Sequence, residues 1–154
     1  MSLSLSRTLF AAAMFAAFPL SALAQDSAVS VSDPYARAVP AGQPNSAAFM
    51  TLSNRSDTSH ALVSAASPAA NTVELHTHVN EGGMMRMRKV ERIEIPAGQT
   101  VVLAPGGLHI MLIGLKQALE PGDSVALDLS FDDGSKAKVQ APVRQIAPMH
   151  PKPH

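Results

Sequence analysis

The 154-residue chain contains no cysteine, no tryptophan and a single tyrosine. Without cysteine it has no disulfides, thiolate metal sites, iron–sulfur clusters or thiol redox chemistry, and no cysteine of this chain can carry a lipoprotein anchor. The same absence removes the cysteine ligand that a blue-copper electron-transfer centre needs. The absence of tryptophan and the single tyrosine argue against a platform on which single-stranded nucleic acid could stack. Methionine, with eight copies, is therefore the only sulfur ligand available.

Charge is scarce as well, because only 16% of the residues are charged and 12 basic residues balance 12 acidic ones. This balance lacks the basic excess typical of proteins that bind DNA or RNA. With 46% hydrophobic residues, the chain is not a charge-rich disordered segment. Its length fits one domain that can bury a sizeable core.

The first 24 residues are predicted to form a secretory signal peptide. Arg7 is the only charged residue before Asp26, an apolar run extends from Thr8 to Phe18, and Ala22-Leu23-Ala24 matches a small-residue cleavage site. The apolar run is short for a membrane span, so an uncleaved anchor is the less favoured alternative. We therefore expect cleavage after Ala24, a periplasmic location and no membrane span in the mature chain.

The mature chain is predicted to be all-β. Turn signals recur along it, for example at Pro105-Gly106-Gly107 and Asp133-Gly134. Short strand-like runs separate them, at residues 46–53, 61–65, 72–79, 84–95, 100–103, 108–113, 124–131 and 137–143. Since no run shows a sustained helical period, residues 25–144 are expected to form one antiparallel sandwich or barrel. Residues 145–154 contain Pro148, Pro151 and Pro153 and are predicted to be a flexible tail.

One predicted hairpin places histidine and methionine on the same face. If residues 80–83 form a four-residue loop, His78 pairs with Met85 and His76 pairs with Met87. Period-2 alternation then puts both histidines and both methionines on one face of the hairpin. Directly opposed side chains have Cβ atoms about 4.5–5.5 Å apart, so these groups can meet.

A second pair of the same kind follows at the start of another run. His109 and Met111 share one face of a strand, and the turn at residues 105–107 precedes them. His109 is therefore expected near a strand end, where sites are commonly built.

These side chains form a neutral ligand set that favours copper(I). Thioethers and imidazoles are soft or intermediate ligands, and soft sulfur selects Cu(I), whereas zinc sites usually contain thiolate, imidazole or carboxylate. A thioether needs no deprotonation and leaves more readily than a thiolate, which suits a carrier that must release its metal. The sequence therefore predicts a Cu(I) site made of His76, Met87, His109 and Met111.

This pattern resembles the signature of the PCuAC family of periplasmic copper(I) chaperones, H-x10-M-x21-H-x-M. Ten residues lie between His76 and Met87, twenty-one lie between Met87 and His109, and Met111 closes the motif. The flanking residues 74–75, 83–88 and 105–110 are also similar to the family, and the likeness extends from about residue 31 to residue 143. The resemblance implies a cupredoxin-like, immunoglobulin-like Greek-key β-sandwich. It also implies Cu(I) held by the four motif side chains and delivered to the CuA centre of cytochrome c oxidase subunit II, directly or through another copper chaperone.

Several further residues are weaker candidates for ligands. His78 and Met85 lie beside the motif, and His78 is more readily explained as a supporting or surface residue than as a ligand. The tail residues Met149, His150 and His154 resemble a C-terminal extension of some family members that helps to bind Cu(II), while a solvated chain end explains them equally well.

Other features have simpler explanations. Met50 and Met84 are expected to pack in the core, whereas His60 has no partner in the motif and is expected at the surface. The segment Asp132-Asp133-Gly134 is predicted to be a hairpin turn, because it lacks the alternating oxygen ligands of a calcium loop. Basic residues gather near the site at 86, 88, 89 and 92, either as a solvated strand face or as a docking surface for an acidic partner.

The function predicted from the sequence is that of a monomeric copper carrier and not of an enzyme. Copper buffering or resistance without a dedicated acceptor is the alternative within the same class. A copper oxidase is disfavoured because thioethers saturate the proposed site and no nucleophile–base motif is recognisable. A metal-free adhesive or adaptor sandwich is the remaining alternative, and it predicts that no metal binds.

Overall fold

The computed structural model describes residues 27–147. The predicted signal peptide and the tail residues Met149, His150 and His154 lie outside this range. Within it, the chain is built from strands and connecting turns, and no helix is long and apolar enough to cross a membrane.

Ten strands make up the described part of the chain. They are β1 (Val29–Arg37), β2 (Asn45–Asn54), β3 (His60–Ala66), β4 (Ala70–Glu81), β5 (Met84–Lys89), β6 (Ile93–Ile95), β7 (Thr100–Leu103), β8 (His109–Leu115), β9 (Ser124–Phe131) and β10 (Lys136–Arg144). The all-β class predicted from the turn spacing is confirmed. The run predicted as one strand over residues 84–95 is two strands, β5 and β6, which belong to opposite ends of the sheet.

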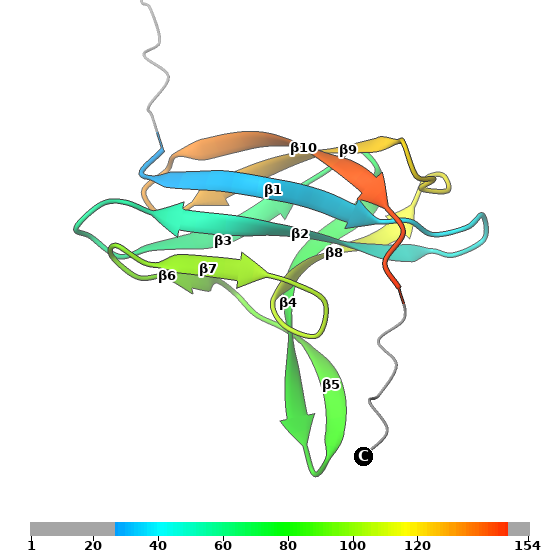
Figure 1. The fold of residues 1–154 in the computed structure, drawn as a ribbon, viewed down its shortest axis with the longest axis horizontal. Helices are drawn as coiled ribbons and strands as arrows, with labels where there is room; N and C mark the ends of the chain where they lie inside the picture. Colours follow the sequence, from blue (N-terminus) through cyan, green and yellow to red (C-terminus); the bar gives the residue numbers. More distant parts are fainter. Residues whose placement is uncertain (1–26, 148–154) are drawn as a thin grey trace, which may run out of the picture.

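The strands form one open sheet that folds over a single core, as Figure 1 shows. Their order is β5-β4-β8-β2-β1-β10-β9-β3-β6, and β7 also pairs with β2. The one parallel pairing among the described strands, between β1 and β10, joins two antiparallel groups through Ala36↔Val143 and Arg37↔Arg144. Fully buried side chains from the two groups, such as Ile110 of β8 and Leu127 of β9, pack in one cluster.

Alternating sequence explains why these segments are strands with one face inward. In β9, Val125, Leu127, Leu129 and Phe131 are buried, whereas Ser124 and Asp128 are exposed. A period of two places the first set in the core and the second in solvent. Met50 of β2 is only 1% exposed, which confirms the prediction that it is a core residue.

The hairpin of β4 and β5 extends beyond the body of the sheet, as Figure 1 shows below the label of β4. Strand β4 pairs with β8 only up to His76↔His109, and its remaining residues pair with β5 alone. We call residues 77–88 the arm. Every residue of β5 is exposed. A two-stranded ribbon of this kind has little stability of its own, so its ordering depends on the base that β8 supports.

The predicted register of this hairpin is wrong by two residues. The turn consists of Gly82 and Gly83, whose φ angles are 60° and 83°, so Glu81 pairs with Met84 and His78 pairs with Met87. Two successive glycines accept positive φ, which permits a two-residue turn instead of the four-residue loop. Because the shift is an even number of residues, His76, His78, Met85 and Met87 still share one face.

Met84 contradicts its predicted role as a core residue. It is 62% exposed and belongs to the opposite face of the arm from Met85 and Met87. None of the ten described strands covers that face, and the side chain is exposed to solvent.

Candidate metal centre

His109, the first residue of β8, is held in one orientation by the turn before it. Its Nδ1–H donates a hydrogen bond to the carbonyl oxygen of Gly107 at 2.9 Å. A carbonyl only accepts, so the neutral ring keeps its lone pair on Nε2. The side chain is buried, and this burial lowers the pKa of His109. His109 is therefore a neutral imidazole at pH 7, which is the form that binds metals.

The pairing of β4 with β8 places the other candidates beside His109. His76 lies directly opposite His109, and Glu74 lies directly opposite Met111. Because opposed residues of an antiparallel pair point to the same face, these four side chains share one face of the sheet. The position predicted for His109, at the end of a strand that follows a turn, is confirmed.

An open cavity of about 920 Å³ lies over this face. It is bounded by the arm, the start of β8, the first half of β2 and the last described residues of the chain. The residues that line it are Arg37, Val39, Gln43, Asn45, Ser46, Ala47, Phe49, His78, Met85, Met87, Pro105, Gly106, His109, Met111, Ile146 and Ala147. The structure thus brings three motif residues, Met87, His109 and Met111, to one cavity, together with both weaker candidates of the arm.

His76, the first residue of the motif, lies next to this cavity but does not line it. Its ring centre is 5.8 Å from that of His109. Its Nε2 is 2.8 Å from a carboxylate oxygen of Glu74, so Nε2–H donates to that oxygen. Its Nδ1 is buried and has no hydrogen-bond partner among residues 27–147. A buried nitrogen lone pair without a partner is costly, and a metal ion is one group that can satisfy it.

Glu74 binds His76 through one carboxylate oxygen and Lys89, at the base of the arm, through the other. One carboxylate oxygen accepts from His76, and the second lies 3.2 Å from the Nζ of Lys89, which is paired with His76 across the strands. The hydrogen bond from His76, and then that from Lys89, lower the pKa of Glu74. The carboxylate is therefore ionised at neutral pH, and it fixes the His76 tautomer whose lone pair is on Nδ1.

The arm contributes an imidazole and two thioethers. His78 and Met87 are directly paired, and Met85 lies one pair further toward the tip on the same face. Met85 is 58% exposed and Met87 is 49% exposed, so the arm holds its sulfur atoms at the open side of the cavity. His109 on the sheet is thus buried and Met111 is partly buried, whereas the two thioethers of the arm are exposed.

The neutral donor set fits a soft metal ion. It consists of imidazoles that have a free lone pair and of thioethers, and it contains no thiolate. Thioethers are poor ligands for hard ions and good ligands for Cu(I). The carboxylate of Glu74 is engaged with His76 and Lys89, so it serves to orient an imidazole.

Three residues at the site were not predicted from the sequence. Glu74 precedes His76 by two positions, and this period-2 spacing was a signal that could have revealed it. Arg37 and Phe49 come from β1 and β2, and the Cζ of Arg37 lies 5.9 Å from the centre of the Phe49 ring. Phe49 in turn lies 6.3 Å from the His109 ring, centre to centre. No local sequence signal joins these two residues to a motif that begins only at His76.

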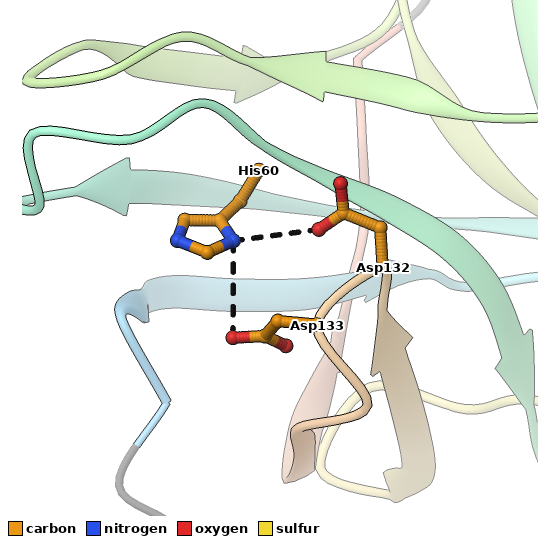
Figure 2. Close-up of side chains that lie close together, drawn as sticks. All are labelled: His60, Asp132 and Asp133. Carbon is orange, nitrogen blue, oxygen red and sulfur yellow. Dashed lines mark hydrogen bonds and ion pairs between the residues drawn. The ribbon is translucent and has the colours of Figure 1, made fainter.

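His60 was expected at the surface, but its side chain is only 12% exposed and has partners outside the motif. Figure 2 shows its Nδ1 facing Asp132 and Asp133, at 3.4 and 3.8 Å from their carboxylate oxygens. Asp132 also pairs with Arg92, and Asp133 accepts hydrogen bonds from Ser135. Each carboxylate therefore has partners within the protein, and the group fastens the β9–β10 turn to the start of β3. The prediction that residues 132–134 form a hairpin turn is confirmed.

Comparison with known proteins places this geometry in a family. Residues 29–143 match the family described as "Putative lipoprotein LpqE-like". The chain is 40% identical over 124 residues to the "Putative lipoprotein Lxx21020" of Leifsonia xyli subsp. xyli (strain CTCB07), and the match covers 80% of this chain and 74% of that protein.

Solved structures show the same architecture. The solution structure of apo-DR1885 from Deinococcus radiodurans superimposes with a TM-score of 0.62 at 36% identity, covering 95% of this chain and 97% of that one. CuI-DR1885 from the same organism gives 0.61 at 38% identity, with 82% and 83% covered. The copper-bound PCuAC domain from PmoF2 gives 0.67 at 21% identity, with 78% and 95% covered, which is a likeness of fold alone. The chain therefore belongs to the LpqE-like family, and its domain is a PCuAC-like β-sandwich, as the resemblance of its motif implied.

Proposed function

We propose that this protein is a copper(I) carrier whose ion is held by Met87, His109, Met111 and His76. The observation that carries the proposal is the convergence of Met87, His109 and Met111 on one cavity from two separate strands. His76 lies opposite His109 and has a buried Nδ1 without a partner, so a small rotation toward the cavity would add its lone pair. The likeness to CuI-DR1885 at 38% identity supports the choice of ion.

The ligands divide into a fixed group and an exposed group. His109 is buried and fastened to Gly107, whereas Met87 is on the arm and half exposed. A thioether at the open side of the cavity can be displaced by an incoming cysteine or methionine of an acceptor while the imidazole still holds the ion. We infer stepwise ligand exchange in which Met87 leaves first. This is the chemistry of a carrier and not of an enzyme. In ligand exchange the ion keeps its oxidation state, and no substrate is converted.

The test of binding is an anaerobic titration of residues 25–154 with Cu(I) against bicinchoninate, a chromogenic Cu(I) chelator. One tightly bound equivalent supports the proposal, and failure to compete with the chelator refutes it. Met87→Ala should weaken this binding. Met84→Ala is its matched control, because Met84 is also an exposed methionine but lies on the opposite face of the arm.

We further propose delivery of copper to the CuA site of cytochrome c oxidase subunit II, directly or through another copper chaperone. The argument for delivery is the exposure of the arm ligands, since a store would gain from burying its ion. The deciding experiment mixes the Cu(I)-loaded protein with an apo CuA domain and follows the CuA absorption. Its appearance supports delivery, and retention of copper favours the alternative of buffering or resistance without a dedicated acceptor.

A periplasmic location after cleavage at Ala24 fits this role, and N-terminal sequencing of the secreted protein tests it. Binding of Cu(II) by Met149, His150 and His154 stays a prediction, tested by comparing Cu(II) binding before and after their replacement. A monomer is expected, and sedimentation of the apo and loaded protein measures it.

A further inference from the structure

His78 and His109 are oriented by the same carbonyl oxygen. Gly107 O lies 2.9 Å from Nδ1 of His109 and 3.4 Å from Nδ1 of His78. Since a carbonyl only accepts, both rings carry their proton on Nδ1 and their lone pair on Nε2. The turn at residues 105–107 thus sets the tautomer of an imidazole on the sheet and of another on the arm.

The distance between these rings fits two imidazoles that bind one ion. Their centres are 5.2 Å apart and their planes are tilted by 34°. Metal–nitrogen bonds of about 2.0–2.1 Å place a metal roughly 3.2 Å from each ring centre, so two rings at a tetrahedral angle lie about 5.2 Å apart. Both residues line the cavity, whereas His76 does not.

The site thereby gains one nitrogen donor, His78, that the sequence motif does not contain. His76 and His78 each lie within 5.8 Å of His109, ring centre to ring centre. Three imidazoles around one point suit ions that prefer nitrogen, and Cu(II) is foremost among these because it binds imidazole strongly and thioether weakly. Met85, Met87 and Met111 face the same cavity and suit Cu(I).

We propose that His78 donates Nε2 to the ion held by His109, and that His76, His78 and His109 together let this cavity accept copper(II) as well as copper(I). The proposal rests on the proposed function, because it adds a ligand and a second oxidation state to the same site. It involves no electron transfer: each ion is bound as supplied.

The experiment titrates the full mature chain with Cu(II) against nitrilotriacetate and records the electron paramagnetic resonance spectrum. Loss of an outer partner of a metal ligand lowers metal affinity roughly tenfold. His78→Ala should lower the Cu(II) affinity by more than this, because it removes a ligand, and it should simplify the nitrogen hyperfine pattern. The same variant should lose less affinity for Cu(I), because the thioethers remain. Met84→Ala is the control for the arm, and thermal unfolding checks that each variant is folded.

A double variant, His150→Ala with His154→Ala, separates the cavity from the tail. Cu(II) binding that survives the tail variant and falls in His78→Ala supports the proposal. Cu(II) binding and a hyperfine pattern that are unchanged in His78→Ala overturn it. Failure of the parent protein to bind Cu(I) would instead refute the proposed function, so the two failures are distinguishable.

Discussion

Replacing Glu74 by glutamine tests whether the carboxylate controls the site through His76. The carboxylate accepts the proton of Nε2 at 2.8 Å, which leaves the lone pair on Nδ1. A glutamine amide has nearly the same shape, but its NH₂ group can donate to Nε2 and thereby move the ring proton to Nδ1. In that tautomer, Nδ1 cannot bind a metal. We therefore expect Glu74→Gln to weaken Cu(I) binding, because the His76 ring must return to the other tautomer before its Nδ1 can bind the ion.

The expected loss follows from how Glu74 is held. Removing an outer partner of a metal-bound histidine costs roughly 10–100-fold in metal affinity. Glu74 divides its two oxygens between His76 and Lys89 and its side chain is 24% exposed, so only one oxygen acts on His76 and water can replace it. The loss should therefore be close to the lower limit, about tenfold.

The assay is the anaerobic Cu(I) competition, with Glu94→Gln as the matched control. Glu94 is an exposed glutamate that pairs with Arg92, and it does not line the cavity. A second readout is the nitrogen NMR spectrum of His76 in the apo protein, in which the tautomer is visible directly. Unchanged affinity together with a shifted tautomer would refute the assignment of Nδ1 as a ligand atom. Unchanged affinity with an unchanged tautomer would refute the positioning role of Glu74.

Three further predictions concern ligand softness, pH and the core. Met111→Ala should weaken Cu(I) much more than Zn(II), because a thioether contributes little to zinc; parallel titrations measure this, and equal losses would contradict the softness argument. Asp132→Asn should lower the Tm at pH 7. The backbone N–H of Ala61 and then the imidazole of His60 lower the pKa of Asp132, so its stabilisation is present above the ordinary aspartate value of about 3.9 and is lost as the pH falls through the lower folded value. The Tm difference should accordingly vanish in acid, and a difference independent of pH would exclude the charge as its cause. Met50→Ala should destabilise the domain by about 2–5 kcal/mol in urea unfolding because it empties a fully buried position, and a loss below about 1 kcal/mol would mean that the core collapses around it.

Local sequence patterns predicted the strands of this fold better than they predicted how the strands pair. The turn signals and the period-2 alternation identified strands such as β9, because the alternation of apolar and polar residues along a strand shows which face is buried. The hairpin register failed because two glycines permit a tighter turn than the spacing of polar residues suggested. The role of Met84 failed for a related reason. A methionine on a strand packs in the core only if another strand covers its face, and no strand covers that face of the arm.

The same distinction applies to the site. Period-2 alternation predicted that His76 and Met87 share one face of a hairpin and that His109 and Met111 share one face of a strand, because both relations are local. The meeting of the two pairs depends on the pairing of β4 with β8, which is not local. The partners of these residues come from elsewhere in the fold, and the contact of His60 with Asp132 depends on the pairing of β3 with β9, which local patterns do not determine. Only the pairing of β4 with β8 reveals that Glu74 lies opposite Met111.

The division of ligands between sheet and arm also explains why the arm need not be stable by itself. A ribbon paired on one side only, with every residue of β5 exposed, fluctuates more readily than the sheet. His109 is fixed to Gly107 and buried, so motion of the arm changes the distance between Met87 and a stationary imidazole. In the proposed carrier, opening the arm would therefore remove its thioethers from the ion while the imidazole and the thioether on β8 retain it, which would leave a vacant position for an acceptor. Burying the arm would tighten binding and, for the same reason, slow transfer.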